Sequence, residues 1–275
     1  MSRPSPFRRS LVVLALQGGA GVLVVCSVLL WCACGFAADV VTMTNPHPDS
    51  SGDKWQDLFR SDLSDAEGSP AGWKYEDGVL AATKDEVIWT ARSYENFTLD
   101  LEFQNSEGTN SGVIVYASDM KDWIPNSVEI QIADDSYKKW AESPRNWQCG
   151  AIFSHVAPAE SRVKAPGEWN RMSISCLGPA ISVAVNGKMV AEMDMRRWRS
   201  AAINPDKTAI PAWLSRPLCE LATEGRIGLQ GKHGPAPIRF RRLRIKENVT
   251  ASQKQDDKSP GEESDVSKES AETSP

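Results

Sequence analysis

Two polar side chains that could do chemistry, Glu129 and Gln131, lie in a stretch that otherwise resembles a buried strand. They alternate with Val128, Ile130 and Ile132, and this period of two predicts a half-buried β-strand with both polar side chains on one face. Glu and Gln are poor strand formers, so their presence indicates a purpose beyond folding. A carboxylate desolvated by flanking loops has a raised pKa and can act as a general base, while the amide can bind hydroxyl groups. The alternative is a solvated outer face on which any polar residue serves.

The second chemical candidate is His233, in the sequence Gln230-Gly-Lys-His-Gly234 that directly follows another predicted strand. The two glycines let the backbone approach a ligand or adopt positive φ angles. An imidazole can act as acid or base near neutral pH, and Lys232 can stabilise an oxyanion. Gln230 shares the open face if the apolar residues of its strand point inward. The alternative is a solvated turn that contains a histidine incidentally.

Two other polar residues are weaker candidates for ligand binding. Asn110 precedes a predicted strand, so its amide could bind ligand hydroxyls or could hold the turn through bonds to the backbone. Arg92 follows the short segment Trp89-Thr90 and could contact an anion or a hydroxyl, although a surface arginine is the default interpretation.

Tryptophans in polar loop sequence form a further group of candidates. Trp123, Trp140 and Trp147 stand among charged residues, where a purely packing role is hard to argue, whereas Trp89 and Trp169 are expected in the core. Indole rings stack on the flat apolar faces of sugar rings, and the indole N–H can reach a hydroxyl. At least one of the three loop tryptophans is therefore a candidate for sugar stacking.

The sequence gives little support for a metal or a disulfide scaffold. No Cys/His cluster has the spacing of a zinc site. Asp134 and Asp135 could ligate calcium, but without a repeated D-x-D pattern a solvated turn is the better interpretation. No cofactor is predicted, with calcium or another divalent ion left open. Cys176 is expected in the core, and Cys149 and Cys219 are a candidate pair that the sequence cannot establish.

Short alternating strands separated by turn residues predict the fold. The strands are expected at 97–103, 113–117, 128–132, 171–176, 181–185, 189–191, 226–230 and 238–245, and Asn186-Gly187 is a hairpin-turn signal. No amphipathic helical run of useful length separates them. The pattern predicts an all-β protein, an antiparallel β-sandwich with long loops. The proline-rich segment 194–219 reads as a long excursion from the sheets, and such loops are usually functional.

The N-terminal segment predicts export. Residues 1–38 combine a basic start, an apolar run and an Ala-rich exit, which are the parts of a signal peptide cleaved after Ala38. An uncleaved anchor is the alternative, and only then is a membrane expected as a partner; a lipoprotein is disfavoured because bulky residues precede Cys34. Either way the remaining chain is expected in the periplasm or outside the cell.

The rest of the chain divides into three predicted parts. Residues 39–53 read as a linker, 54–247 as one β-sandwich module and 248–275 as a disordered acidic tail with almost nothing apolar to bury. The 275 residues are 41% hydrophobic and carry a formal net charge of −5, so a general nucleic-acid surface is not expected.

An ordered set of motifs resembles one family. The set comprises Trp55-Gln-Asp-Leu-Phe59, Trp73-Lys-Tyr-Glu-Asp-Gly-Val-Leu80, Asn110-Ser-Gly-Val-Ile-Val115, Val128-Glu-Ile-Gln-Ile132, Pro166-Gly-Glu-Trp-Asn170 and Gly225-Arg-Ile-Gly-Leu-Gln-Gly231. No single motif is specific, but their order across nearly the whole module is similar to the 3-keto-disaccharide hydrolase domain family. The chain departs from the usual pattern at 121–125 and 137–148, which look longer and richer in Trp and could change what fits the site.

The resemblance implies a concanavalin-like jelly roll that acts on or binds oxidised glycosides. A 3-keto group acidifies the C2 hydrogen, so a base can remove it, the C1 substituent can leave by elimination, and water can add back. Glu129 and His233 are the expected catalytic pair, without an assignment of acid and base, and a separate sugar oxidase is expected upstream. The rival hypotheses are a non-catalytic carbohydrate-binding module and, less favoured, an adhesion or scaffold protein.

Overall fold

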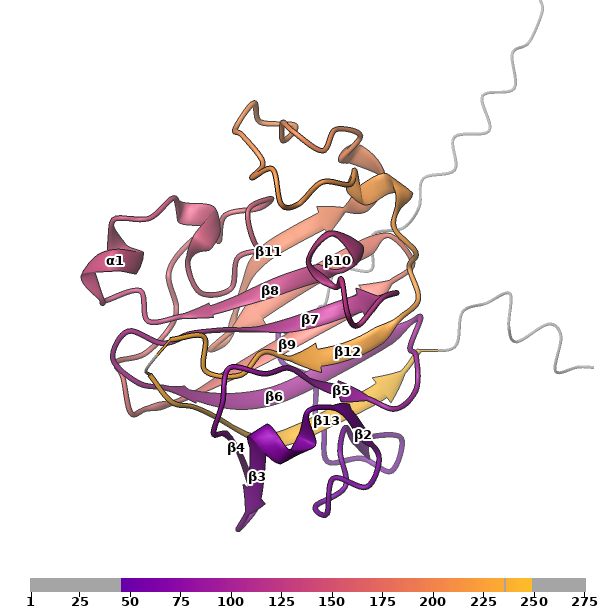
Figure 1. Cartoon of the computed structure of the whole chain (residues 1–275), viewed down its shortest axis with the longest axis vertical. Coiled ribbons are helices and arrows are strands. Elements are labelled where there is room, and N and C mark those ends of the chain that lie inside the picture. Colours follow the sequence, from indigo (N-terminus) through magenta and orange to yellow (C-terminus); the bar gives the residue numbers. More distant parts are fainter. Residues whose placement is uncertain (1–45, 235, 249–275) are drawn as a thin grey trace, which may run out of the picture. The chain divides into compact units, whose positions relative to one another are not determined.

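The computed structural model describes residues 46–234 and 236–248, whose strands form two antiparallel sheets stacked as two layers (Figure 1). The first sheet contains, in spatial order, β11 (Lys188–Asp194), β10 (Ala180–Val185), β9 (Trp169–Leu177), β6 (Phe97–Asn105), β13 (Ile238–Glu247), β4 (Val79–Ala82) and β3 (Trp73–Glu76), with β1 (Gln56–Asp57) also paired to β13. The second contains β2 (Ala66–Gly68), β5 (Ile88–Thr90), β12 (Arg226–Leu229), β7 (Asn110–Ala117) and β8 (Val128–Ala133). The predicted antiparallel β-sandwich is confirmed.

Helical structure in the described residues is confined to single turns. The α-helix α1 spans Lys138–Ala141, and 3₁₀ turns lie at η1 (Pro70–Gly72), η2 (Ile124–Asn126), η3 (Arg145–Trp147), η4 (Met195–Arg197) and η5 (Leu218–Glu220). Most of these turns lie in the loops that cover the outer face of the second sheet or border it (Figure 1). Among residues 46–234 and 236–248, none of the helices has the length and apolar character that a membrane span requires.

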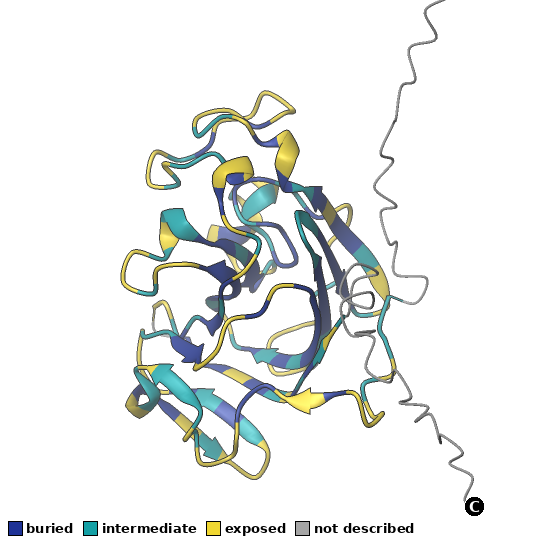
Figure 2. Cartoon of the chain, turned by 90° about the vertical axis from the view of Figure 1, so that its right-hand side faces the viewer, coloured by how far each residue is buried: buried dark blue, intermediate teal, exposed yellow. Residues whose placement is uncertain are grey.

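The core lies between the sheets and explains why the strands form. Ile130 and Ile132 of β8 belong to one cluster of buried side chains with Leu99 and Leu101 of β6 and Phe240 of β13. Burying each of these side chains stabilises the fold by about 1.5–3 kcal/mol. Figure 2 shows the strands largely buried and the loops largely exposed. Since alternate residues face the core, the intervening residues of β8 must point to the outer face of the second sheet.

The turn between β10 and β11 has the geometry that the sequence predicts. Asn186 and Gly187 have φ angles of 44° and 83°, as a two-residue hairpin turn of the primed type requires. Asn186 also accepts a hydrogen bond from the Arg171 backbone N–H and donates to the Arg162 carbonyl oxygen, which ties the hairpin to its neighbours.

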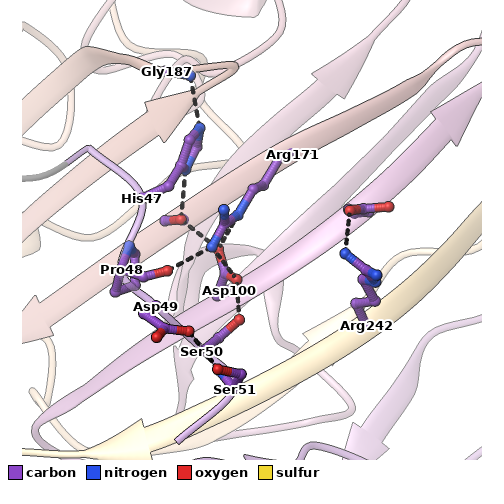
Figure 3. Close-up of polar contacts among 11 residues, drawn as sticks. His47, Pro48, Asp49, Ser50, Ser51, Asp100, Arg171, Gly187 and Arg242 are labelled. Atoms are coloured by element: carbon purple, nitrogen blue, oxygen red, sulfur yellow. Dashed lines mark hydrogen bonds and ion pairs between the residues drawn. The ribbon is translucent and has the colours of Figure 1, made fainter.

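Part of the predicted linker is instead bound to the first sheet. We call residues 46–51 the N-terminal strap (Figure 3). The His47 ring contacts the Ser173 hydroxyl at 2.8 Å through Nδ1 and accepts the Gly187 N–H at 2.7 Å through Nε2. Arg171 donates to the Pro48 carbonyl oxygen at 2.6 Å. The linker prediction is therefore wrong for these residues, because hydrogen bonds to strands β9 and β6 hold them.

Other predictions meet different outcomes. Cys149 and Cys219 are free thiols, one buried and one exposed, so the candidate disulfide does not form, while Cys176 is buried as predicted. The predicted N-terminal export segment falls on residues 1–38, outside the described residues, and so does the predicted tail after Asn248.

Candidate functional site

A cavity of about 760 Å³ lies on the outer face of the second sheet. Its floor is formed by β8, β7, β5 and the residue after β12, and its walls come from the loops 84–87, 120–127, 139–155 and 213–214. A volume of this size suits a disaccharide-sized ligand. The long excursion between β11 and β12 contributes Trp213 and Leu214, so this loop takes part in building the site.

Glu129 stands on the cavity floor without a partner among the residues that the structure describes. Its carboxylate forms no hydrogen bond or ion pair with the residues that the structure describes, and desolvation raises the pKa of Glu129 to about 8. The side chain lies directly over Gly112 of β7, where an added Cβ would come within 2.4 Å of Oε1. Glycine at this position therefore makes the room in which the carboxylate sits. A partly buried acid with a raised pKa and no partner is typical of functional sites.

Amide groups surround the carboxylate on the same floor. Gln131 is 1% exposed and donates through Nε2 to Asn110 Oδ1 at 2.9 Å, which fixes the orientation of both amides. Gln230 Oε1 is buried and lacks a hydrogen-bond partner among the described residues. A buried acceptor without a partner costs free energy, so this oxygen is suited to receive a ligand hydroxyl.

His233 reaches the same cavity from the other side of the floor. Its Nδ1 lies 2.9 Å from Asp85 Oδ2. Since an ionised carboxylate only accepts, Nδ1 carries the proton and Nε2 is left to accept one. Glu129 and His233 thus line one cavity, which is the geometry required for an acid and a base to act on one ligand.

Tryptophans form much of the walls. Trp123 packs edge-on against Trp89 with ring centroids 6.3 Å apart, and Trp140 is buried beneath the Lys139 ammonium group. Trp147 contacts both Phe153 and Trp213, the latter with centroids 6.3 Å apart. All three loop tryptophans singled out by the sequence line the cavity. The combination of indole walls and floor amides is chemically suited to a sugar.

Three cavity residues escape sequence reasoning. His155 is buried, and its Nδ1 donates to the Phe153 carbonyl oxygen at 2.7 Å, so Nε2 is the acceptor of the neutral ring; burial lowers the pKa of His155. Because the chain has only three histidines, each of them, His155 included, could have been considered as a candidate site residue. Trp213 could have been found as a tryptophan in a proline-rich loop. Asp85 gave no signal, because it lies 148 residues before His233.

Comparison with known proteins assigns the chain to a family. The sequence profile described as "3-keto-alpha-glucoside-1,2-lyase-like domain" matches residues 54–246. The chain belongs to this family. The resemblance seen in the sequence motifs is therefore confirmed.

Individual members of known function or structure agree with this assignment. A 3-keto-disaccharide hydrolase of Bacteroides thetaiotaomicron is 26% identical over 207 residues, covering 64% of this chain and 70% of the relative. A solved Parabacteroides distasonis protein, named provisionally as a glycosyl hydrolase, is 53% identical with a TM-score of 0.69, covering 70% of this chain and 99% of that chain. A second such structure from the same organism is 22% identical with a TM-score of 0.59, covering 71% and 94%, and supports the fold alone.

The structure corrects the sequence-based predictions for three residues of this lyase-like domain. Arg92 does not line the cavity, because its guanidinium pairs with Glu247 at 2.7 Å and stacks over Tyr94. Lys232 is likewise absent from the cavity wall, although its neighbour His233 is present. Trp169 lies half-buried at the surface of the first sheet under Arg241 rather than in the core.

The predicted solvated turn at Asp134 and Asp135 is also wrong. Asp134 is buried and accepts the Gly108 N–H and the Ser136 hydroxyl, and Asp135 accepts the Cys149 N–H. These carboxylates thus hold loops in place. Among residues 46–234 and 236–248, no group of three or more His, Cys, Asp or Glu side chains is placed to hold a metal ion.

Proposed function

We propose that the protein cleaves 3-keto-glycosides by elimination across C1 and C2 followed by addition of water. The observation that carries the proposal is Glu129, a carboxylate with no partner among residues 46–234 and 236–248, on the floor of a cavity built from amides and tryptophans. The family description and the hydrolase from B. thetaiotaomicron support the same substrate class.

The chemistry balances with groups that the cavity contains. A base removes the C2 proton, and the electron pair delocalises onto the C3 ketone as an enolate. The enolate re-forms the ketone while the C1–O bond breaks, and the leaving oxygen takes a proton. Water then adds across the C1–C2 double bond, with its hydroxyl on C1 and its proton on C2, so the net reaction is hydrolysis. This route requires an acid and a base, without the two carboxylates that flank the scissile bond in ordinary glycosidases.

We assign the base to Glu129 and the proton donor to the His233–Asp85 pair. A carboxylate whose pKa is raised to about 8 is a stronger base than an ordinary one and is still partly ionised at neutral pH. Asp85 accepts the Nδ1 proton and so orients His233, whose ring lines the cavity and can deliver a proton to the leaving oxygen. The amides of Gln131 and Gln230 hold the sugar hydroxyls.

The proposal extends to the cell compartment and to the preceding reaction. We place the enzyme outside the cytoplasm, on the strength of the signal-like segment 1–38. A 3-keto-glycoside arises from a glycoside by oxidation of the C3 hydroxyl. A separate enzyme must therefore supply the substrate by removing two electrons and two protons from that position.

The test is incubation of purified protein with 3-ketotrehalose, with release of 3-ketoglucose and glucose followed by chromatography. With Glu129 as the base, kcat/KM of the wild type depends on a group with a pKa of about 8, and Glu129→Gln loses this dependence together with most of the rate. A Glu129→Gln variant that keeps both the rate and this pH dependence contradicts the assignment of the base. Absence of product together with binding of the sugar would show a non-catalytic carbohydrate-binding module.

A further inference from the structure

A second hollow of about 650 Å³ adjoins the cavity, between the segment 144–157 and the excursion 206–213. Trp147, His155 and Trp213 line both hollows and form their common boundary. The rest of its lining is mainly apolar and includes Pro144, Ile210 and Pro211. A ligand that fills the cavity can therefore continue over the two indole rings into this second hollow.

Trp213 is the most exposed large aromatic side chain at this boundary. It is 54% exposed, in an excursion most of whose residues are exposed or only half-buried. Its ring meets Trp147 nearly edge-on, at an interplanar angle of 65°, and this contact supports the indole while leaving much of it uncovered. A supported but uncovered indole offers a platform for a flat apolar face.

Several polar groups of the second hollow are bonded within the protein. Asp206 accepts both the N–H and the hydroxyl of Thr208, and Arg145 donates to two backbone carbonyl oxygens. The Asn146 side chain makes no hydrogen bond with the described residues, although its backbone oxygen is fixed by the Ser154 N–H. A free amide on a fixed backbone, next to aromatic walls, can bind the hydroxyls of a ring whose C–H face rests on the indole.

We infer that the second hollow is a subsite for the leaving sugar of the substrate, bound against Trp213 and Asn146, an inference that rests on the proposed function. The oxidised ring occupies the cavity above Glu129, and the leaving sugar extends past Trp147 into the second hollow. The enzyme is thereby selective for glycosides whose C1 substituent is itself a sugar. A small alcohol in place of that sugar leaves the second hollow unused.

The test compares two substrates, 3-ketotrehalose and methyl 3-keto-α-glucoside, in the wild type and in Trp213→Ala. Loss of one ring-stacking contact should lower kcat/KM for the disaccharide about tenfold more than kcat/KM for the methyl glycoside. Asn146→Ala should show the same selective loss, to a smaller degree. Ile203→Ala is the matched control, because Ile203 is 52% exposed in the same excursion and lines neither hollow.

Equal effects of Trp213→Ala on both substrates, or none on either, would overturn the subsite while leaving the proposed function intact. A wild type inert on both substrates contradicts the proposed function. The subsite is then judged by calorimetric titration with trehalose and methyl α-glucoside. Tighter binding of the disaccharide that Trp213→Ala abolishes supports the subsite, and equal affinities contradict it.

Discussion

The two sheets each hold a carboxylate away from bulk water, and the two carboxylates are treated in opposite ways. Asp100 of β6 is 3% exposed and accepts four hydrogen bonds, two from Arg171 and one each from Ser173 and Ser50 (Figure 3). Glu129 of β8 has no partner among the described residues. One carboxylate is saturated by the fold and the other is left open toward a cavity.

The difference distinguishes a carboxylate that stabilises the fold from one that is available to react with a ligand. Withdrawing a carboxylate from water costs free energy, which paired donors offset at Asp100. At Glu129 nothing offsets the cost, so the pKa rises and the proton is held more tightly. The protein keeps an acid in an unfavourable state where it meets a ligand, and the rest of the fold must supply the stability that this position loses.

The largest expected effect comes from Glu129→Gln, which keeps the side-chain shape over Gly112 and removes the base. We expect kcat to fall about 10²- to 10⁴-fold in the 3-ketoglucose release assay. Because the pKa of Glu129 is raised by folding, the folded chain holds a proton that the unfolded chain has released between about pH 4.5 and 8. The free energy of unfolding of the wild type therefore decreases as pH rises through this window. In Glu129→Gln this decrease should be absent.

Urea unfolding at pH 5 and pH 8 measures the second half of that prediction. Glu192→Gln, at an exposed position of β11, is the matched control and should change neither the rate nor the pH dependence. Full activity of Glu129→Gln would remove the main support for the proposed chemistry. An unchanged pH dependence of stability would show that the carboxylate is better solvated than its surroundings indicate.

The fold and the floor of the cavity could be predicted from the sequence because both follow from local alternation. The period of two in β8 places Glu129 and Gln131 opposite Ile130 and Ile132, and the core of any sandwich then decides which face is open. The expectation of a core position was wrong for Trp169, which lies half-buried under Arg241. An alternation pattern does not tell which of two sheet faces a long loop will cover.

The remaining parts of the site depend on contacts between residues distant in the chain. Asp85 reaches His233 across 148 residues, and Trp213 reaches Trp147 from another loop. Arg92 was misjudged for the same reason, since its partner Glu247 lies at the far end of the module. A pattern in a single sequence does not reveal which distant residues pair in space. The loop tryptophans could be selected as candidates only because their sequence neighbours are polar.

The next effect in size tests the saturated carboxylate. Arg171→Ala removes two of the donors to Asp100 and leaves a buried carboxylate with two serine hydroxyls. We expect the free energy of unfolding in urea to fall by about 3 kcal/mol, with kcat nearly unchanged, because the network lies on the first sheet, away from the cavity. Arg242→Ala is the control, since this exposed arginine makes only a 3.4 Å contact with Glu102 and should cost at most about 0.5 kcal/mol. A loss of activity without a loss of stability in Arg171→Ala would contradict the division between the two regions.

The smallest effect concerns the pH response of the N-terminal strap, which should run opposite to that of the cavity. Burial and the nearby Arg171 charge lower the pKa of His47, against a weaker opposing effect of Asp100, and protonation of Nε2 would conflict with the Gly187 N–H that it accepts. The unfolded chain therefore binds this proton more readily, so stability is present above about pH 6.5 and is lost as pH falls below it.

Replacement of His47 should lessen the loss of stability at acid pH. It should leave unchanged the fall in stability with rising pH that is assigned to Glu129. His47→Gln should reduce the loss of unfolding free energy between pH 6.5 and 5, because the pKa of His47 is lowered in the folded chain. His155, whose pKa is also lowered, accounts for part of what remains. Lys188→Gln, an exposed change on the adjoining hairpin, serves as the control. If His47→Gln instead altered the decline between pH 5 and 8 that belongs to Glu129, the strap and the cavity would be coupled, and the two carboxylates could not be treated as separate systems.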